Sequence, residues 1–229
     1  MIFSPDNKIR QYLIFKLLAE VKIFCVIPGR SFSYLVYRIK TVIRDHFGDK
    51  RLGIITIGGS KFDDNLSLHK DGIAYQATPY DLIKKLIDYL KVTPDDVFID
   101  FGCGKGRVVF SIARYKLKKV IGVELRKDLA DIAMRNLRNL KSNKTLVEII
   151  NADAATFAVN DGTMFFMFNP FGQATLDSIV QNIKNSLVAN PRSIRITYYG
   201  GANHNLLDKH GWLKYEGRIN NMPVHFWHN

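Results

Sequence analysis

Short and nearly unbroken hydrophobic runs alternate with amphipathic segments through the middle of the chain. The runs at 97–101, 120–124, 146–150, 164–168 and 193–198 are predicted to be strands. Helices are predicted over 127–140 and 174–188, and from the glycine-rich stretch after residue 101 to about residue 115. Continuous apolar runs are typical of strands buried on both faces of a parallel sheet. Their alternation with helices indicates a doubly wound α/β fold with a mostly parallel sheet.

The C-terminal segment has a different pattern. Residues 212–218 and 222–227 are separated by Ile-Asn-Asn, which predicts an antiparallel hairpin. Pro223 places this hairpin at one edge of the sheet, because proline cannot donate a ladder hydrogen bond.

The N-terminal segment is predicted to be a helical extension packed on the main domain. Apolar positions recur at helical spacing from Leu35 to Ile43, and Gly48 is a plausible C-cap. A loop is expected over 48–74. We therefore expect the extension and its loop over residues 1–74 and the main domain over 75–229.

Composition limits the class of protein. The chain has 229 residues, of which 47% are hydrophobic, enough for one compact domain with a sizeable core. Cys25 and Cys103 form no metal-spaced pair, and they favour a reducing, cytoplasmic setting. No metal site is expected. No apolar run approaches the roughly 20 residues of a membrane span, and the first residues do not resemble a signal peptide.

Positive charge is concentrated in the N-terminal extension. The net charge is +12, and residues 1–51, with ten basic and four acidic side chains, carry +6 of it. A basic solvated face over a small core is the preferred interpretation. Contact with a membrane surface or with nucleic acid is the alternative.

The sequence Asp-Phe-Gly-Cys-Gly-Lys-Gly at 100–106 follows the first predicted strand and precedes a helix. Glycines there allow a tight turn and a close approach to a ligand. Glu124 ends the next strand, where a carboxylate suits a ribose diol. Arg107 stands where a dinucleotide fingerprint needs its third glycine, and the carboxylate of Asp100 would repel a pyrophosphate but attract an amine. The ligand is therefore expected to be nucleoside-like, with a positive group and no phosphates.

These features resemble the class I S-adenosylmethionine-dependent methyltransferases. The matching pieces are Asp-Phe-Gly-Cys-Gly-Lys-Gly at 100–106, Val-Ile-Gly-Val-Glu at 120–124, Asn-Ala-Asp at 151–153 and Asn-Pro-Phe at 169–171. The resemblance implies that Asp100 interacts with the methionine amine, through the loop or water, above Gly102 and Gly104. It further implies that Glu124 binds the ribose hydroxyls. The adenine contacts that it implies are packing by Leu125 and a hydrogen bond to Asp153.

The segment before the first strand, Tyr75-x-x-Thr78-Pro79, is similar to the upstream loop of the seven-strand protein-lysine methyltransferases, including the non-SET histone-lysine type. Tyr75 and Thr78 are therefore candidate cofactor contacts. They are equally well explained as a core aromatic residue and a helix N-cap. Small bacterial methyltransferases of unassigned substrate also have a similar Asn-Pro-Phe after the fourth strand.

Asn169 is the candidate catalytic residue, because the Asn-Pro-Phe segment resembles the acceptor motif of nitrogen methyltransferases. Tyr198, Tyr199 and His204 are further candidates to line the acceptor pocket. The expected function is methyl transfer to a nitrogen of a protein side chain, with lysine first. RNA and small-molecule methylation remain alternatives, as does a non-catalytic protein that binds the cofactor. The acceptor and the oligomeric state are not determined.

Overall fold

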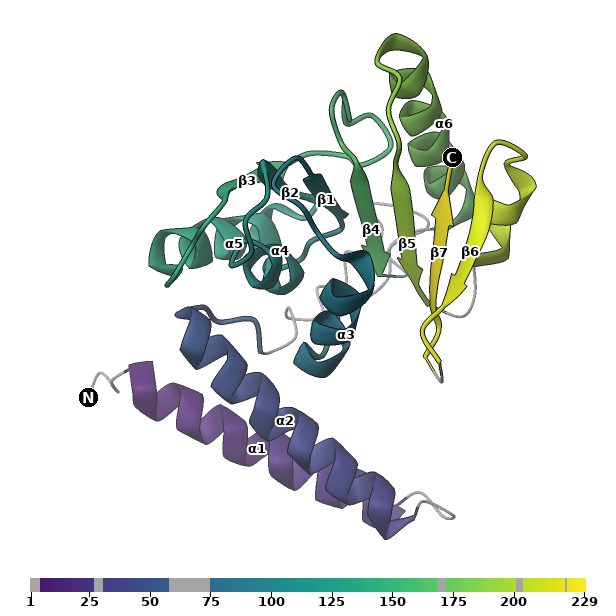
Figure 1. Ribbon diagram of the computed structural model, residues 1–229. Helices are drawn as coiled ribbons and strands as arrows, with labels where there is room; N and C mark the ends of the chain where they lie inside the picture. The colour runs from purple at the N-terminus through teal and green to yellow at the C-terminus, as the bar shows by residue number, and fades with distance from the viewer. Residues whose placement is uncertain (1–4, 27–30, 58–74, 169–171, 201–203, 221) are drawn as a thin grey trace.

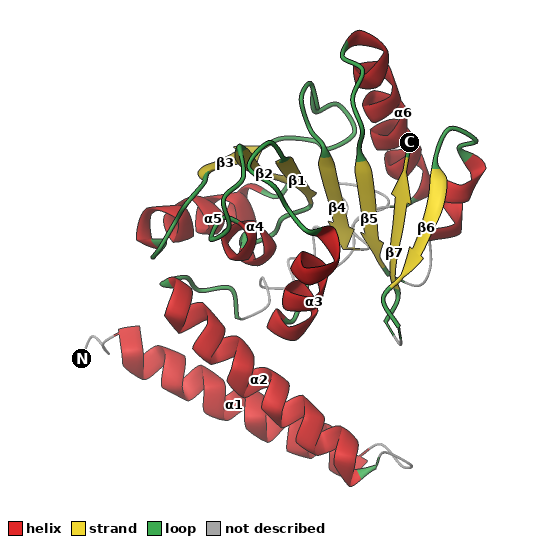
Figure 2. Cartoon of the chain, in the orientation of Figure 1, coloured by secondary structure: helices red, strands yellow, loops and turns green. Residues whose placement is uncertain are grey.

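A mixed sheet of seven strands forms the centre of the molecule (Figures 1 and 2). The computed structural model describes residues 5–26, 31–57, 75–168, 172–200, 204–220 and 222–229. The strand order is β3-β2-β1-β4-β5-β7-β6. The strands are β1 (Val97–Phe101), β2 (Lys119–Glu124), β3 (Leu146–Asn151), β4 (Met164–Phe168), β5 (Arg195–Tyr199), β6 (Lys214–Arg218) and β7 (Val224–His228).

The sheet reverses its winding between β1 and β4. Strands β1 to β5 are parallel, and β1 pairs with β2 on one side and with β4 on the other. In open sheets of this kind, ligands bind at the carboxyl ends of the strands where the order reverses. The C-terminal hairpin is antiparallel, as predicted: β7 pairs with β5, and β6 forms the edge. Pro223 precedes β7 and does not interrupt its ladder.

Helices cover both faces of the sheet. They are α3 (Tyr80–Leu90), α4 (Arg107–Ile112), α5 (Lys127–Asn139), α6 (Gln173–Ala189) and the 3-10 helix η2 (His204–Lys209). Alternate residues of β1 face opposite sides: Phe98 packs in the core with α3 and α4, whereas Ile99 packs in the core with α6 and η2. Burial on both faces is the reason why these strands are continuously apolar in the sequence.

The N-terminal extension is a pair of helices, α1 (Pro5–Val26) and α2 (Phe32–Leu52), lying beneath α3 in Figure 1. Within the described residues, the predicted helical character of the extension is confirmed, but α2 does not end at Gly48. It continues to Leu52, and Gly53 is the C-cap, with a left-handed φ of 77° and its N–H bonded to the carbonyls of Asp49 and Lys50. Gly48 is small for another reason: a Cβ there would lie 2.3 Å from Cε2 of Tyr80.

The start of α3 also differs from the prediction. Pro79 occupies the N-cap position rather than Thr78, and the helix begins at Tyr80. The side chain of Asp45, from α2, accepts a hydrogen bond from the Tyr80 N–H at 3.4 Å. A long-range carboxylate therefore replaces the expected local capping box. The sequence could not show this contact, because it joins residues 35 positions apart.

Candidate active site

The carboxyl ends of the parallel strands bring several predicted residues together. Asp100 lies near the end of β1, Glu124 ends β2 and Asn151 ends β3. Residues 102–106 form a loop between β1 and α4, and its first N–H groups donate to the Val123 carbonyl, from Gly102 at 2.8 Å and from Cys103 at 3.1 Å. This loop is thereby fixed against the end of β2.

The glycines of this loop are required by their backbone conformation. Gly102, Gly104 and Gly106 have φ values of 75°, 57° and 88°, in the left-handed region that side chains rarely adopt. A Cβ on Gly104 would also lie 2.3 Å from Cε2 of Tyr75. The loop and the Tyr75 ring are therefore in direct contact.

Asp100 is buried with no internal partner in the described part of the chain. The residue is 3% exposed, and none of the described residues donates a hydrogen bond or forms an ion pair with its carboxylate. Burial, and then the nearby charge of Glu124, raise the pKa of Asp100 well above its usual range. A buried carboxylate without a donor is costly. A ligand with a positively charged hydrogen-bond donor would offset that cost.

Glu124 is held in one orientation by backbone donors from two loops. Its Oε2 accepts from the N–H of Gly104 at 2.8 Å, and its Oε1 accepts from the N–H of Arg126 at 2.9 Å. Burial raises the pKa of Glu124, and these two hydrogen bonds oppose that rise. A carboxylate has about four lone-pair sites, so each oxygen keeps one for a ligand hydroxyl.

The predicted adenine-binding residues lie beside Glu124 but are less closely fixed. Leu125 is exposed at the edge of the sheet. Oδ1 of Asp153 accepts from the N–H of Ala155 at 2.8 Å, which is a local turn contact. The amide of Asn151 donates to the carbonyls of both Glu124 and Leu125 at 2.8 Å. Asn151 therefore positions the Glu124–Leu125 turn, a role that the sequence reasoning did not assign.

Tyr75 and Thr78 both lie against the glycine loop. The Tyr75 hydroxyl donates to the Thr56 carbonyl at 2.9 Å, and Nζ of Lys105 lies 4.9 Å from the centre of its ring. The hydroxyl of Tyr75 is thus held by the backbone, and its ring packs against the glycine loop. Thr78 is buried, and its carbonyl accepts from Nη1 of Arg107 at 3.1 Å.

Arg107 is the centre of a buried network that the sequence reasoning missed. Its Nη1 lies 2.6 Å from Oδ2 of Asp45, and its Nε lies 2.6 Å from Oγ1 of Thr56 and 3.4 Å from Oδ1 of Asp49. Burial alone would lower the pKa of Arg107, but Asp49 and Asp45 outweigh it and raise that pKa. Asp49 also accepts from the Tyr80 hydroxyl at 2.8 Å. Helix α2 is therefore joined to the first residue of α4, directly after the glycine loop.

A second side chain strengthens this connection. Asn136 on α5 donates to the carbonyls of Lys105 and Ile55, at 2.9 and 3.1 Å, and accepts from the Ile55 N–H at 2.9 Å. Residues 54–57 of the extension are therefore anchored to the glycine loop. The only sign of this network in the sequence was Arg107 itself, which stands where a dinucleotide fingerprint would have its third glycine.

Aromatic side chains occupy the carboxyl ends of β4 and β5. The rings of Phe168 and Tyr199 stack with centroids 4.1 Å apart. Burial raises the pKa of Tyr199, and the phenol of Tyr37 on α2 raises it further. Tyr198 is instead buried in the core that packs against α6. Asn169 and the rest of Asn-Pro-Phe lie outside the described residues, as does the side chain of His204.

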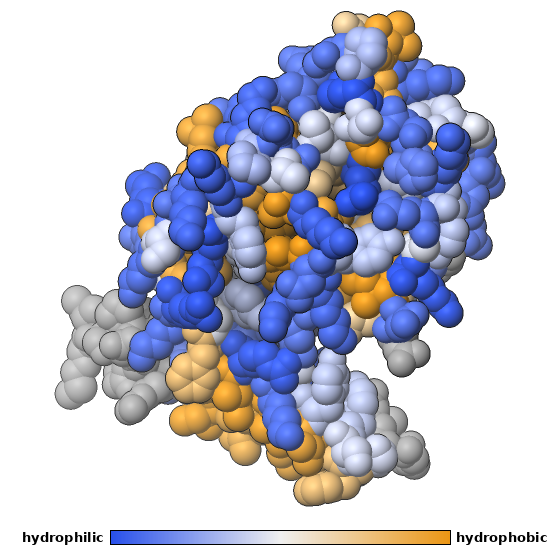
Figure 3. Space-filling model, in the orientation of Figure 1, coloured by the Kyte–Doolittle hydropathy of each residue, from blue (hydrophilic) through white to orange (hydrophobic). Residues whose placement is uncertain are grey.

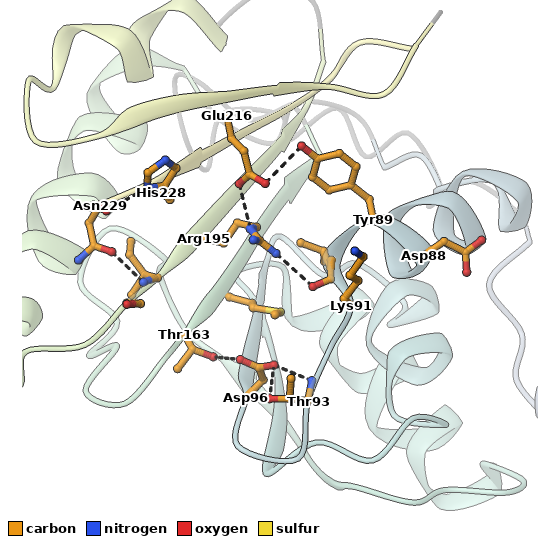
Figure 4. A pocket seen from close by; sticks show the side chains of 14 residues that line it. Asp88, Tyr89, Lys91, Thr93, Asp96, Thr163, Arg195, Glu216, His228 and Asn229 are labelled. Carbon is orange, nitrogen blue, oxygen red and sulfur yellow. Dashed lines mark hydrogen bonds and ion pairs between the residues drawn. The ribbon is translucent and has the colours of Figure 1, made fainter.

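The large groove shown in Figure 4 is not this site. It has a volume of about 1030 Å³ and includes Asp96, Thr163 and Arg195, at the amino ends of β1, β4 and β5. Its polar groups are paired internally: Arg195 with Glu216 at 3.0 Å, and Thr163 with Asp96 at 2.9 Å. It lies opposite the edge that carries the glycine loop, and we interpret it as structural.

The described ranges contain neither a candidate metal site nor a candidate membrane-spanning helix. Among the described residues, no cluster of histidine, cysteine or carboxylate side chains could hold a metal ion. No helix in the described ranges is both long enough and apolar enough to cross a membrane.

Comparison with known proteins supports the sequence resemblance. Residues 71–162 match the family described as "Histone methylation protein DOT1". Over 116 residues, the chain is 34% identical to a histone H3 lysine-79-specific histone-lysine N-methyltransferase of Dictyostelium discoideum, covering 45% of this chain and 6% of that protein. Over 98 residues, it is 28% identical to a protein-lysine N-methyltransferase of Saccharolobus islandicus, covering 42% of this chain and 60% of that protein. The chain thus spans less than two thirds of either relative.

A solved structure shows the same fold. An RNA methyltransferase from Salinibacter ruber, in complex with S-adenosyl-L-homocysteine, superposes with a TM-score of 0.50 at 19% identity, covering 67% of this chain and 92% of that one. Together with the strand order, this similarity confirms the predicted α/β fold of the class I methyltransferases.

Proposed function

We propose that this chain, whose fold is that of the class I methyltransferases, transfers a methyl group from S-adenosylmethionine to a nitrogen of a protein side chain, with lysine as the first choice. The observation that carries the proposal is the carboxylate of Asp100, buried without a donor in the described chain beside a left-handed glycine loop. A carboxylate in that position excludes a phosphate-bearing ligand and favours one with an ammonium group.

The residues of the site fit this cofactor. In our proposal Asp100 accepts from the methionine amine, through the loop or through water, and Gly102 and Gly104 leave room beneath the methionyl group. Glu124, held by the N–H groups of Gly104 and Arg126, accepts from the ribose hydroxyls. At the adenine, Leu125 packs on the ring and Asp153 accepts from its amino group. The Tyr75 ring and Thr78 close the methionine end.

S-adenosylmethionine, when bound, supplies a methyl group on a positively charged sulfur. The protein then has to exclude water and to position a neutral acceptor nitrogen. The stacked rings of Phe168 and Tyr199 give the acceptor side an apolar wall, and burial favours the neutral form of an amine. We propose that Asn169 accepts a hydrogen bond from the acceptor nitrogen.

Two observations support a protein acceptor. The curated relatives are a histone-lysine and a protein-lysine methyltransferase, and the similarity includes the segment with Tyr75 and Thr78, because the family match begins at residue 71. A cytoplasmic location also remains a proposal.

Cofactor choice can be measured by thermal stabilisation. S-adenosylmethionine and S-adenosylhomocysteine should raise the melting temperature, because they bind the folded state. At about 100 times its dissociation constant, such a ligand adds roughly 2.7 kcal/mol to the free energy of unfolding. NADH at equal concentration is the control and should do much less, because its pyrophosphate would face Asp100. A larger shift with NADH would contradict the assignment.

The acceptor can be identified with methyl-labelled S-adenosylmethionine and a cell lysate. Parallel samples are digested with protease or with ribonuclease. We expect protease to release the label and amino-acid analysis to find it on lysine. Loss of label with ribonuclease would replace the protein acceptor by RNA, and label in small molecules would indicate a metabolite. Cofactor binding with no labelled product would favour a non-catalytic role.

A further inference from the structure

Helix α1 is apolar on two faces, of which only one is covered in the described structure. Leu13, Leu17 and Phe24 are half-buried on the face that also carries Glu20, which pairs with Arg38 of α2. Outside this face, the helix exposes Ile14, Leu18 and Val21 on the adjacent side, and Phe15 and Val26 lie further round. Their exposed fractions are 58% for Ile14, 69% for Phe15, 63% for Leu18, 40% for Val21 and 68% for Val26.

These exposed apolar residues are neighbours on one helix and are not scattered singly over the surface. A helix that is hydrophobic all round is normally buried, and exposed apolar patches mark interaction sites. Phe32, Ile43 and Phe47 extend the exposed apolar character to α2. Figure 3 shows hydrophobic residues gathered at the bottom of the molecule, over the helix pair that Figure 1 labels.

The charges of the helix pair are sorted between the inside and the outside. Glu20 pairs with Arg38, while Asp45 and Asp49 face the buried Arg107. The basic side chains that remain exposed on the pair include Lys22, Lys40, Lys50 and Arg51. The exposed charge of the pair is therefore mainly positive.

We propose that the α1–α2 pair docks on an anionic membrane surface. The exposed face of α1 enters the boundary between headgroups and acyl chains, and the exposed lysines and arginines contact lipid phosphates. Membrane-surface binding grows with the apolar area that enters the interface and with electrostatic attraction to anionic lipids, and the helix pair offers both. Lysine and arginine also keep their charges in the headgroup layer while their stems lie along apolar surface.

Other occupants agree less well with these observations. A second copy would bring the same positive charge to the interface, and like charges disfavour that pairing. A nucleic acid would be attracted by the lysine and arginine side chains, and its bases stack on aromatic rings. The aliphatic side chains of Ile14, Leu18 and Val21 offer no such stacking surface. Of these three occupants, an anionic lipid surface is the one that matches both the apolar and the positive component.

Docking in this way would also orient the candidate active site. Asp45 and Asp49 of helix α2 pair with Arg107, directly after the glycine loop. The helix pair is thus attached beside the candidate site. The proposal does not depend on methyl transfer and can fail or succeed independently of it.

The test is co-sedimentation of the full chain with vesicles of phosphatidylcholine alone or with about 30% phosphatidylglycerol. We expect binding to the anionic vesicles that weakens as salt rises, because screening shortens the field to about 8 Å at 0.15 M. The double variant Phe15→Glu/Leu18→Glu should lose at least about tenfold in apparent affinity, because it places charges at the acyl boundary. Val188→Glu on α6 is the matched control, since Val188 is 80% exposed but remote from the pair.

A site-specific readout uses the two cysteines. Cys25 is exposed on α1, whereas Cys103 is buried and its pKa is raised by that burial. A polarity-sensitive thiol dye should therefore label Cys25, and its emission should shift to the blue on anionic vesicles. Circular dichroism checks that each variant is folded.

Several outcomes would overturn the proposal. One is the absence of binding at millimolar lipid, and another is an equal loss in Val188→Glu and the double variant. A dimer in light scattering that the double variant dissociates would assign the face to a second copy. Binding to RNA with no binding to vesicles would assign it to nucleic acid.

Discussion

The buried carboxylate of Asp100 is expected to lower the stability of the free protein and to raise its affinity for the cofactor. Its pKa is raised in the folded state, chiefly by burial and then by Glu124. An aspartate with a raised folded pKa contributes stability that is present below its unfolded pKa and is lost as pH rises through the folded pKa. Ionisation of this group as pH rises therefore destabilises the free protein.

Asp100→Asn should consequently raise the melting temperature of the free protein, by about 2–4 °C for each kcal/mol relieved. The gain should shrink as pH falls, because the wild-type carboxyl then becomes neutral too. Affinity for S-adenosylhomocysteine should fall about ten- to a hundredfold, since a charge-assisted hydrogen bond of about 1.5–3 kcal/mol is lost. Scanning calorimetry and titration calorimetry measure the two effects. A less stable variant with unchanged affinity would contradict this role.

Glu124 should behave differently, because it is bonded inside the protein. Glu124→Ala leaves the N–H groups of Gly104 and Arg126 without their acceptor. We expect both a lower melting temperature and cofactor binding weakened by about 1.5–3 kcal/mol. Asp128→Ala is the control, because Asp128 is exposed and pairs with the Arg126 side chain. A folded Glu124 variant with unchanged affinity would remove this residue from the site.

At the scale of elements, the network around Arg107 joins α2 to the start of α4. Arg107→Met would leave Asp45 and Asp49 buried without their cation, and breaking a buried pair in this way costs about 3–5 kcal/mol. Urea unfolding should show this loss. Lys118→Ala, which breaks the exposed pair with Asp161, should cost less than about 1 kcal/mol. Equal losses in the two variants would show that the network does not stabilise the fold.

Across the whole molecule, stability should be graded from the sheet to α1. Strands β1 and β4 are buried in the centre of the sheet, whereas α1 packs on α2 through one face and exposes the other. Local opening is easiest where few apolar contacts cover an element. Amide hydrogen exchange should therefore be fastest in α1 and slowest in β1 and β4. Protection of α1 as strong as that of β1 would contradict this order, and α5 is the internal reference.

The sequence by itself determined the central sheet and the placement of the candidate site residues at its strand ends. Periodic apolar runs report burial on both faces, so the strands could be read directly. The loop glycines and the positions of Asp100 and Glu124 at strand ends also follow from local sequence, because parallel strands bring their carboxyl ends to one edge.

Only the tertiary structure decided how the N-terminal helices attach. Gly48 resembles a C-cap locally, but α2 continues to Leu52, so that Asp49 reaches Arg107. Thr78 resembles an N-cap, but Asp45 supplies the capping oxygen from another helix. These contacts join residues 58 and 35 positions apart, and no local pattern encodes such a pairing. The uncovered face of α1 is equally invisible in the sequence, because a helix apolar on two sides does not reveal which side its neighbour covers.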